Sequence, residues 1–177
     1  MEVTEFEIEG LLVIKPKIFY DKRGFFYEVY NKYHYSFFKN FSCVQENESK
    51  SKYGVLRGLH FQKKPYEQAK LVRVISGKVL DVAVDLRKSS KTYGKYKSII
   101  LSGRNKLQFF IPRGFAHGYV VLSRSAVFSY LVDNKYSSKH ESGIIYDDKD
   151  LNIDWSLPKR DIIVSEKDSK LGLFNDN

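Results

Sequence analysis

Short apolar segments, separated by glycine, proline, asparagine and serine, recur along the chain at nearly regular intervals. In the clearest of them, residues 79–86, every even position is aliphatic, while the odd positions include Asp81 and Asp85. Successive side chains of a strand point to opposite faces, so this alternation predicts a strand whose two faces have different surroundings. The same criteria predict further strands at residues 11–14, 25–30, 43–47, 54–62, 71–75, 98–101, 107–111, 117–122 and 126–132.

Helical periodicity is nearly absent from the chain. Residues 31–41 carry aromatic residues at rough helical spacing and predict one short helix, and the loop-rich tail from Asp150 predicts a short terminal helix or turn. Residues 50–135 show no helical period, which excludes a doubly wound α/β fold. Short strands at regular spacing instead predict an antiparallel sandwich or barrel. Because no linker or internal repeat divides the 177 residues, we expect a single domain spanning residues 1–177.

Residues 54–62, Gly-Val-Leu-Arg-Gly-Leu-His-Phe-Gln, combine a predicted strand with side chains that can do chemistry. Arg57 carries a permanent charge, and His60 is of the residue type that titrates near neutrality, a pairing that suits proton transfer on an anionic substrate. On a regular strand these two side chains would point to opposite faces. A bulge or bend near Gly58 must therefore bring them together if both serve one site. The alternative is an ordinary half-buried strand whose histidine caps a local hydrogen bond.

Charge narrows the class of partner. The chain has 30 Lys and Arg against 21 Asp and Glu, a net charge of +9, which favours nucleic acid, a membrane surface or a phosphorylated small molecule. The basic residues are scattered, and no helix-turn-helix or zinc-finger spacing occurs, so we expect no nucleic-acid partner. No apolar run approaches the roughly 18 residues of a membrane span. The acidic N-terminus shows no secretory signal, so we expect a cytoplasmic protein without a membrane partner.

Metal and nucleophile chemistry are disfavoured. The single Cys43 excludes an internal disulfide and a cysteine-rich metal site. A histidine metal site in a small β-barrel usually has two histidines one residue apart, a nearby Glu and a third histidine on a later strand. Here Gln62 follows His60 where the second histidine would stand, so we predict no metal. The Gly-x-Ser-x-Gly, dinucleotide and P-loop patterns are absent as well.

Acid/base chemistry on an anionic substrate remains. Of the four histidines, which are His34, His60, His117 and His140, two lie in strand-like segments beside glycine, where a backbone can approach a ligand closely. These two are His60 and His117. His60 is the candidate base, and Tyr130 or another tyrosine is the candidate acid. The candidate anion holders are Arg23, Arg57, Lys70, Arg73 and Arg113.

Several longer motifs occur in order between about residues 10 and 170. They are Asp21-x-Arg23-Gly24-Phe25-Phe26-x-Glu28, residues 54–62, Lys70-Leu71-Val72-Arg73, residues 81–90, Ile111-Pro112-x-Gly114-Phe115-Ala116-His117-Gly118 and Ser165-x-Lys167-Asp168. Together they resemble the dTDP-4-dehydrorhamnose 3,5-epimerase family. The resemblance implies an all-β, cupin-type jelly roll with one or two short helices, usually a homodimer, that uses no metal or other cofactor. It implies an epimerase that inverts C3 and/or C5 of a nucleotide-diphosphate 4-keto sugar.

By match to the family's motifs, four residues carry the reaction. His60 would remove the proton next to the ketone, and Asp168 would pair with the far nitrogen of its ring and hold the tautomer. Tyr130 would stand on the opposite face of the sugar and return a proton there. Lys70 would stabilise the charge that forms on the ketone oxygen.

Other matches imply substrate binding. Arg57 would contact the diphosphate, to which a guanidinium donates paired hydrogen bonds. His117 would lie near the sugar and phosphate, and Tyr136 would pack against the nucleotide. The remaining matches line the cleft or receive the base and its sugar: Arg23, Phe26, Glu28, Gln45 and Asn47.

Two places depart from the family pattern. The family usually reads Tyr-Lys-x-Thr-x-Tyr-Tyr where this chain has Tyr-Leu-Val-Asp-Asn-Lys-Tyr at residues 130–136, so Lys135 replaces an aromatic residue. Gln45-Glu46-Asn47 replaces the commoner Gln-Asp-Asn. Both places fall close to the sugar and nucleotide subsites. The sequence therefore leaves open a dTDP-linked hexose or a GDP-linked 4-keto heptose of surface-polysaccharide synthesis, and one inverted carbon or two. It also leaves open a sugar-nucleotide 3,4-ketoisomerase and a non-catalytic nucleotide-sugar binding module.

Overall fold

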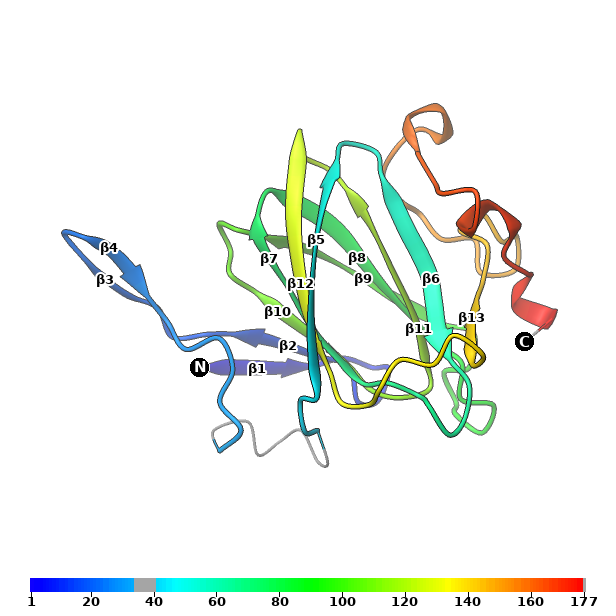
Figure 1. Ribbon diagram of the computed structural model, residues 1–177, viewed down its shortest axis with the longest axis horizontal. Coiled ribbons are helices and arrows are strands. Elements are labelled where there is room, and N and C mark those ends of the chain that lie inside the picture. The colour runs from blue at the N-terminus through cyan, green and yellow to red at the C-terminus, as the bar shows by residue number, and fades with distance from the viewer. Residues whose placement is uncertain (34–40, 177) are drawn as a thin grey trace.

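The computed structural model describes residues 1–33 and 41–176, and two antiparallel sheets form its body (Figure 1). The six-stranded sheet contains, in spatial order, β1 (Glu2–Glu5), β2 (Leu12–Lys15), β10 (Gln108–Ile111), β7 (Lys70–Ser76), β12 (Ser125–Val132) and β5 (Gln45–Lys52). The five-stranded sheet contains β13 (Glu141–Gly143), β6 (Leu56–Gln62), β11 (Phe115–Val121), β8 (Lys78–Asp85) and β9 (Tyr96–Ser102). The all-β prediction is confirmed.

Each face of the five-stranded sheet packs against a different apolar cluster. Between the sheets lies a core that includes Phe109 and Phe128, both almost fully buried, together with Val79 of β8. On the outer face, Leu80 and its neighbours pack against residues 144–174, among them Trp155 and Phe174. This arrangement explains the alternation read in residues 79–86, because odd positions enter the inner core and even positions enter the outer one.

The predicted strands appear with shifted ends. β5 continues to Lys52, although its sequence, Gln-Glu-Asn-Glu-Ser-Lys-Ser-Lys, has no apolar residue. Its inward side chains, Asn47, Ser49 and Ser51, are more buried than their neighbours, so the alternation is one of burial and not of hydrophobicity. The short strands β1, β13 and β3 (Phe19–Asp21) were not predicted, because none of them contains an apolar run like that of β2.

Helical structure in the described residues is confined to the tail, where a short helix or turn was predicted. The described residues contain three single-turn 3₁₀ helices, η1 (Lys159–Asp161), η2 (Asp168–Lys170) and η3 (Phe174–Asp176), in the loop-rich tail. The helix predicted at residues 31–41 falls largely on residues 34–40, which lie outside the described part. In residues 1–33 and 41–176 no helix has the length and hydrophobicity needed to cross a bilayer.

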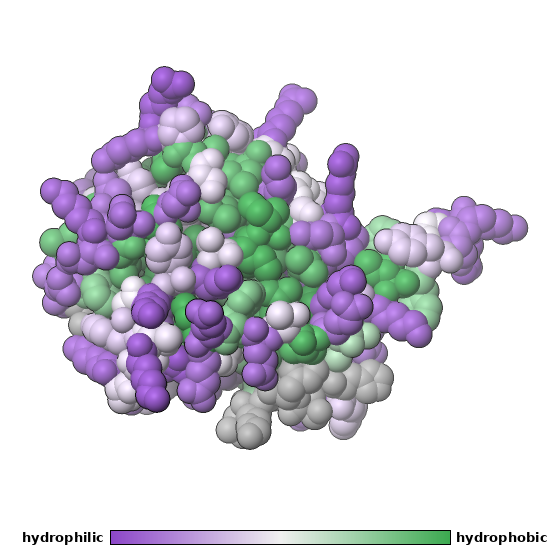
Figure 2. All heavy atoms as spheres, turned by 180° about the vertical axis from the view of Figure 1, so that it is seen from behind, coloured by the Kyte–Doolittle hydropathy of each residue, from purple (hydrophilic) through white to green (hydrophobic). Residues whose placement is uncertain are grey.

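A small hairpin projects from the body near the N-terminus (Figure 1). It is formed by β3 and β4 (Gly24–Phe26), so the strand predicted at residues 25–30 ends early. Its turn is closed by Asp21, which accepts a hydrogen bond from the backbone of Arg23 at 2.8 Å and pairs with the guanidinium. Figure 2 shows the hydrophilic tip and the hydrophobic residues nearer the body. Phe26 is 68% exposed, so this aromatic surface is uncovered within one chain.

The buried carboxylate of Asp85 organises the connection from β8 to β9. It has no exposed surface and accepts hydrogen bonds from the Arg87 guanidinium at 2.8 Å and from the hydroxyls of Ser90 and Thr92 at 2.7 Å each. Burial raises the pKa of this carboxyl, but the hydrogen bonds from Arg87, Ser90 and Thr92 outweigh that effect and lower the pKa to about 2.

Replacing Asp85 with alanine should lower the free energy of unfolding by roughly 3 kcal/mol, because the side chains of Arg87, Ser90 and Thr92 lose their shared acceptor. The pKa of Asp85 is lower in the folded protein than in the unfolded chain. Its contribution is therefore present above a pH of about 4 and is lost as the pH falls toward about 2. Urea denaturation at several pH values measures both effects. Glu7→Ala, at an exposed position, should change the free energy by less than about 0.5 kcal/mol; an equal loss in both variants would contradict the assignment.

Candidate active site

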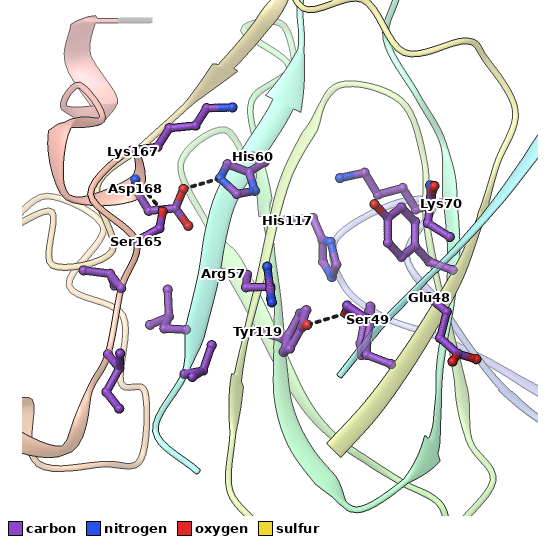
Figure 3. A pocket seen from close by; sticks show the side chains of 17 residues that line it. Glu48, Ser49, Arg57, His60, Lys70, His117, Tyr119, Ser165, Lys167 and Asp168 are labelled. Carbon is purple, nitrogen blue, oxygen red and sulfur yellow. Dashed lines mark hydrogen bonds and ion pairs between the residues drawn. The ribbon is translucent and has the colours of Figure 1, made fainter. Parts of the chain in front are cut away.

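A cavity of about 510 Å³ opens between the two sheets (Figure 3). An adjoining cavity of about 260 Å³ shares Asn47, His60, Lys70 and Tyr130 with it, so the two form one cleft. One wall of the cleft comes from β5, β7 and β12, and the facing wall comes from β6 and β11. The C-terminal segment at residues 163–168 forms part of the rim. Side chains from both sheets therefore face the same space.

His60 and Asp168 form a hydrogen-bonded pair across 108 positions of sequence. Nε2 of His60 lies 2.9 Å from Oδ1 of Asp168, and the other carboxylate oxygen accepts the backbone N–H of Gly58 at 3.2 Å. Because an ionised carboxylate only accepts hydrogen bonds, Nε2 carries the proton and Nδ1 of the neutral ring keeps a free lone pair. In Figure 3 this second nitrogen lies on the side of the ring away from Asp168. Asp168 is itself held, because the hydroxyl of Ser165 accepts its backbone N–H at 3.0 Å.

The bulge predicted near Gly58 is present. His60 pairs with His117 of β11, and Arg57 pairs with Tyr119, so three steps along β6 match two steps along β11. Gly58 has φ +123° and lies so close to β11 that a Cβ there would be 2.6 Å from the Cα of Gly118. The extra residue turns Arg57 and His60 to the same face, and both line the cleft.

Arg57 presents its guanidinium to the cleft. Its Nε donates to the hydroxyl of Ser51 at 3.1 Å, and no ion pair joins it to an acid in the described parts of the chain. A neutral partner on Nε orients the planar group and leaves its terminal amino groups available for an oxyanion.

A buried pair, His117 and Asp81, lies near the partly buried Lys70, and both His117 and Lys70 line the cleft. Nε2 of His117 lies 2.9 and 3.0 Å from the two oxygens of Asp81, whose side chain has no exposed surface. Burial lowers the pKa of His117, so the ring is neutral at pH 7 and donates to the carboxylate. Burial also lowers the pKa of Lys70 to about 8, although the charges of Asp81 and Glu141 oppose that shift. A weakly held proton therefore lies on a lysine beside the cleft.

Tyr130 reaches the cleft from β12, on the sheet opposite His60. Burial and the nearby Tyr119 raise the pKa of its phenol, so the hydroxyl is protonated at neutral pH. Asn47 is its cross-strand neighbour on β5 and lines the same cleft. A proton donor and a proton acceptor thus lie on facing walls of one cavity, with an ammonium group beside them.

The adjoining part of the cleft contains more polar and aromatic groups. Gln45, whose amide donates to the side chain of Asn47 at 2.8 Å, lies there with Tyr136. The hydroxyl of Tyr136 donates to Glu141 at 2.7 Å, and Lys167 pairs with the same carboxylate at 2.6 Å.

Three predicted binding residues do not enter this cleft. Arg23 and Phe26 lie on the projecting hairpin, and Glu28 follows it as an exposed residue that accepts a hydrogen bond from Asn31. The sequence could not show this, because adjacency in the chain does not fix where a hairpin points. Among residues 1–33 and 41–176 no three side chains of His, Cys, Asp and Glu gather as a metal site would require. Gln62 hydrogen-bonds loop backbone instead.

Sequence reasoning missed several residues that line the cleft or hold the residues lining it. Asp81, which holds His117, had a signal, because it is a carboxylate in a largely apolar strand. Lys167 had a weaker one, because it precedes Asp168 in a recognised motif. Ser51 and Glu141 had none, since a serine in a polar strand and a glutamate after a loop resemble surface residues.

Known proteins match the chain over almost its whole length. A family model described as dTDP-4-dehydrorhamnose 3,5-epimerase matches residues 5–176. The dTDP-4-dehydrorhamnose 3,5-epimerase of Shigella flexneri is 49% identical over 170 residues, covering 95% of this chain and 93% of that protein. The crystal structure of the enzyme of that name from Elizabethkingia anophelis matches with a TM-score of 0.95 at 49% identity, covering 100% of this chain and 98% of that one.

A third match carries a ligand. The structure of dTDP-6-deoxy-D-glucose-3,5-epimerase from Legionella pneumophila, in complex with dTDP-4-keto-L-rhamnose, matches with a TM-score of 0.94 at 45% identity, covering 98% of this chain and 93% of that one. These matches confirm the family, the cupin-like all-β fold and the class of enzyme, a nucleotide-sugar epimerase, that the sequence predicted. The chain belongs to the dTDP-4-dehydrorhamnose 3,5-epimerase family.

Proposed function

We propose that this protein inverts C3 and C5 of a dTDP-linked 4-keto-6-deoxy sugar, using only side chains of the cleft. The observation that carries the proposal is the His60–Asp168 pair on one wall, opposite Tyr130 on the other. The relatives' names support a dTDP-hexose over a GDP-heptose, and the Legionella enzyme was solved with such a sugar. We also propose that residues 1–177 form one catalytic domain, because residues from Asn47 to Asp168 line one cleft.

The first step is removal of a carbon-bound proton. A hydrogen next to the ketone is weakly acidic because the electrons of the broken C–H bond pass to the ketone oxygen. Nδ1 of His60 takes the proton, and Asp168 stabilises the imidazolium that results while keeping the ring in place. The product of this step is an enolate whose charge lies largely on the C4 oxygen.

Lys70 offers the positive charge that this oxygen needs. Its ammonium lines both parts of the cleft, and partial burial strengthens its attraction to a developing anion. Arg57 holds the diphosphate on the same wall as His60, and His117, kept neutral and directed by Asp81, orients the sugar.

The second step decides the stereochemistry. Tyr130 donates its phenolic proton to the enolate carbon from the wall opposite His60, so the new C–H bond forms on the other face and the centre is inverted. His60 is then protonated and Tyr130 is ionised. Exchange with water restores both groups, which introduces solvent hydrogen at each inverted carbon. The same cycle at the second carbon completes the reaction.

The exposed hairpin supports a homodimer. Four aromatic side chains of β3 and β4, Phe19, Tyr20, Phe25 and Phe26, are 53–73% exposed, which is a large apolar surface for a short element. We propose that a second copy of the chain covers this surface. Arg23 and Phe26 thereby reach the partner's cleft, where they contact the base of the bound nucleotide. The cytoplasmic location stays a prediction from sequence.

Solvent exchange tests the proposed reaction. Wild-type protein in deuterated water should place deuterium at C3 and C5 of dTDP-4-keto-6-deoxyglucose and form the inverted product. His60→Asn should lose both activities by about 10²- to 10⁴-fold. Tyr130→Phe should slow inversion by a similar factor and retain more exchange than inversion, because His60 returns deuterium from its own face. Tyr53→Phe, a tyrosine that lines neither part of the cleft, is the matched control. NMR of the sugar reads all of these.

Other outcomes of that experiment would replace the proposal. A product with its carbonyl moved to C3 would indicate a 3,4-ketoisomerase, and binding without exchange would indicate a binding module. Exchange with a GDP-linked 4-keto heptose, tested side by side, and none with the dTDP-linked sugar would change the substrate.

The pH dependence of kcat tests Lys70. Its pKa of about 8 means that the amine loses its charge above this pH, so kcat should decline on the alkaline side of about pH 8. The charge of Asp81 raises the pKa of Lys70, so Asp81→Asn should shift that decline to lower pH. An alkaline limb that does not move in Asp81→Asn would show that another group causes it.

Mixing two inactive variants tests the shared cleft. Arg23→Ala and His60→Ala should each have low activity when assayed alone at substrate concentrations below KM. If Arg23 serves the partner's cleft, heterodimers contain one intact cleft, and random pairing should restore roughly a quarter of wild-type activity. Mixing His60→Ala with Asp168→Ala is the control, since both variants damage the same cleft and no intact one can form. No recovery in the first mixture, or a monomer by light scattering, would contradict the proposal.

A further inference from the structure

Gln62 occupies the end of β6, two residues after His60 on the same face, and is 7% exposed. Its side-chain amide donates to the carbonyl of Tyr66 at 2.6 Å and to the carbonyl of Lys135 at 3.1 Å, and it accepts the backbone N–H of Ser137 at 2.6 Å. Both donors and the acceptor oxygen are therefore used. All three partners are backbone groups, and they come from two segments far apart in sequence.

These two segments are residues 63–69, between β6 and β7, and residues 133–140, between β12 and β13. Further contacts join them. Gln68 donates to the carbonyl of Asn134 at 2.7 Å, the backbone of Lys63 donates to the carbonyl of His140 at 2.8 Å, and the rings of Tyr66 and His140 lie 4.3 Å apart. Among these side chains, only Gln62 belongs to β6, the strand that also carries His60, the proposed catalytic base.

The two bonds from Gln62 to residues 133–140 lie on either side of Tyr136. One is to the carbonyl of Lys135 and the other is to the N–H of Ser137, so the backbone is held immediately before and immediately after this residue. Tyr136 itself is 54% exposed and its ring has little packing to hold it. Its position in the cleft therefore depends on its backbone and on the hydroxyl bond to Glu141.

We infer that Gln62 is a positioning residue for nucleotide recognition: it fixes the aromatic ring of Tyr136 at a set place relative to His60. The inference rests on the proposed function, in which Tyr136 packs against the nucleotide. His60, the proposed proton acceptor, and Gln62, which holds the backbone on either side of Tyr136, lie two residues apart on the same strand, β6. The sugar carbons and the nucleotide are thereby placed by one element.

Kinetics and binding of Gln62→Leu test this role. The variant keeps a side chain of similar volume and removes all three hydrogen bonds. The dissociation constant for dTDP and the KM for the dTDP-linked sugar should rise roughly tenfold, while kcat at saturation should fall less than about threefold. Gln62→Glu keeps the acceptor for Ser137 but turns a carboxylate oxygen toward the carbonyls of Tyr66 and Lys135, so it should weaken dTDP binding by at least as large a factor. If circular dichroism shows that Gln62→Leu is unfolded, Gln62→Glu is tested instead, and the same rise in the dTDP dissociation constant and KM with little change in kcat is expected.

A double-mutant cycle with Tyr136→Ala separates positioning from general loosening of the fold. If Gln62 acts through Tyr136, Gln62→Leu should change dTDP affinity by less than about twofold in the Tyr136→Ala background. The inference would be overturned if Gln62→Leu weakened dTDP binding by the same factor in wild type and in Tyr136→Ala. It would also be overturned if the single variants bound dTDP as wild type does, or if kcat fell by a larger factor than KM rose. Wild-type protein is measured first: failure of wild type to bind dTDP would refute the proposed function, and normal wild-type binding with any of those outcomes would refute only the role of Gln62.

Discussion

The hydrogen bond between His60 and Asp168 is coupled through the same carboxylate to a local irregularity of β6, and the rest of the cleft is arranged around it. At Gly58 the strand contains one residue more than β11 beside it, and this residue turns Arg57 to the face of His60. The same carboxylate that pairs with His60 also accepts the N–H of Gly58, so one acid holds both the imidazole and the backbone of the bulge. Anion binding and proton removal thereby share a rigid support.

Charged groups buried in this cleft are supported by partners and not by solvent. Asp81 is fully buried, His117 donates its compensating hydrogen bond, and Lys70 contributes a nearby positive charge. Burial still raises the pKa of the carboxyl and lowers that of Lys70. Such a group stabilises the fold less than an apolar cluster of equal volume would. Its value lies in chemistry, because a desolvated ammonium interacts strongly with a charge that appears only during reaction. The apolar clusters on both faces of the five-stranded sheet provide the stability that this arrangement requires.

Much of the fold and part of the site could be predicted from sequence. The alternation of residues 79–86 predicted a strand whose two faces differ. The opposite parity of Arg57 and His60 predicted a bulge near Gly58 if both residues serve one site. The three-dimensional position of Arg23 and Phe26 could not be predicted, because no local pattern shows that a hairpin leaves the body of its own chain. β5 shows a second limit: its inward side chains are polar because they face a cleft, so a hydrophobic period never forms. The role of Gln62 depends on backbone groups about 70 positions away, which composition and spacing cannot reveal.

The distance in sequence between His60 and Asp168 has a consequence for biosynthesis. The barrel's inner core is complete by the end of β12, whereas the carboxylate of the pair belongs to a 3₁₀ turn that begins at residue 168 of 177. A chain emerging from the ribosome can therefore bury that core well before it has a competent base. The covering segment that packs Trp155 and Phe174 onto the outer face also delivers Asp168. The segment that covers the outer core therefore also completes the rim of the cleft and the catalytic pair, so the cavity and its chemistry are assembled together.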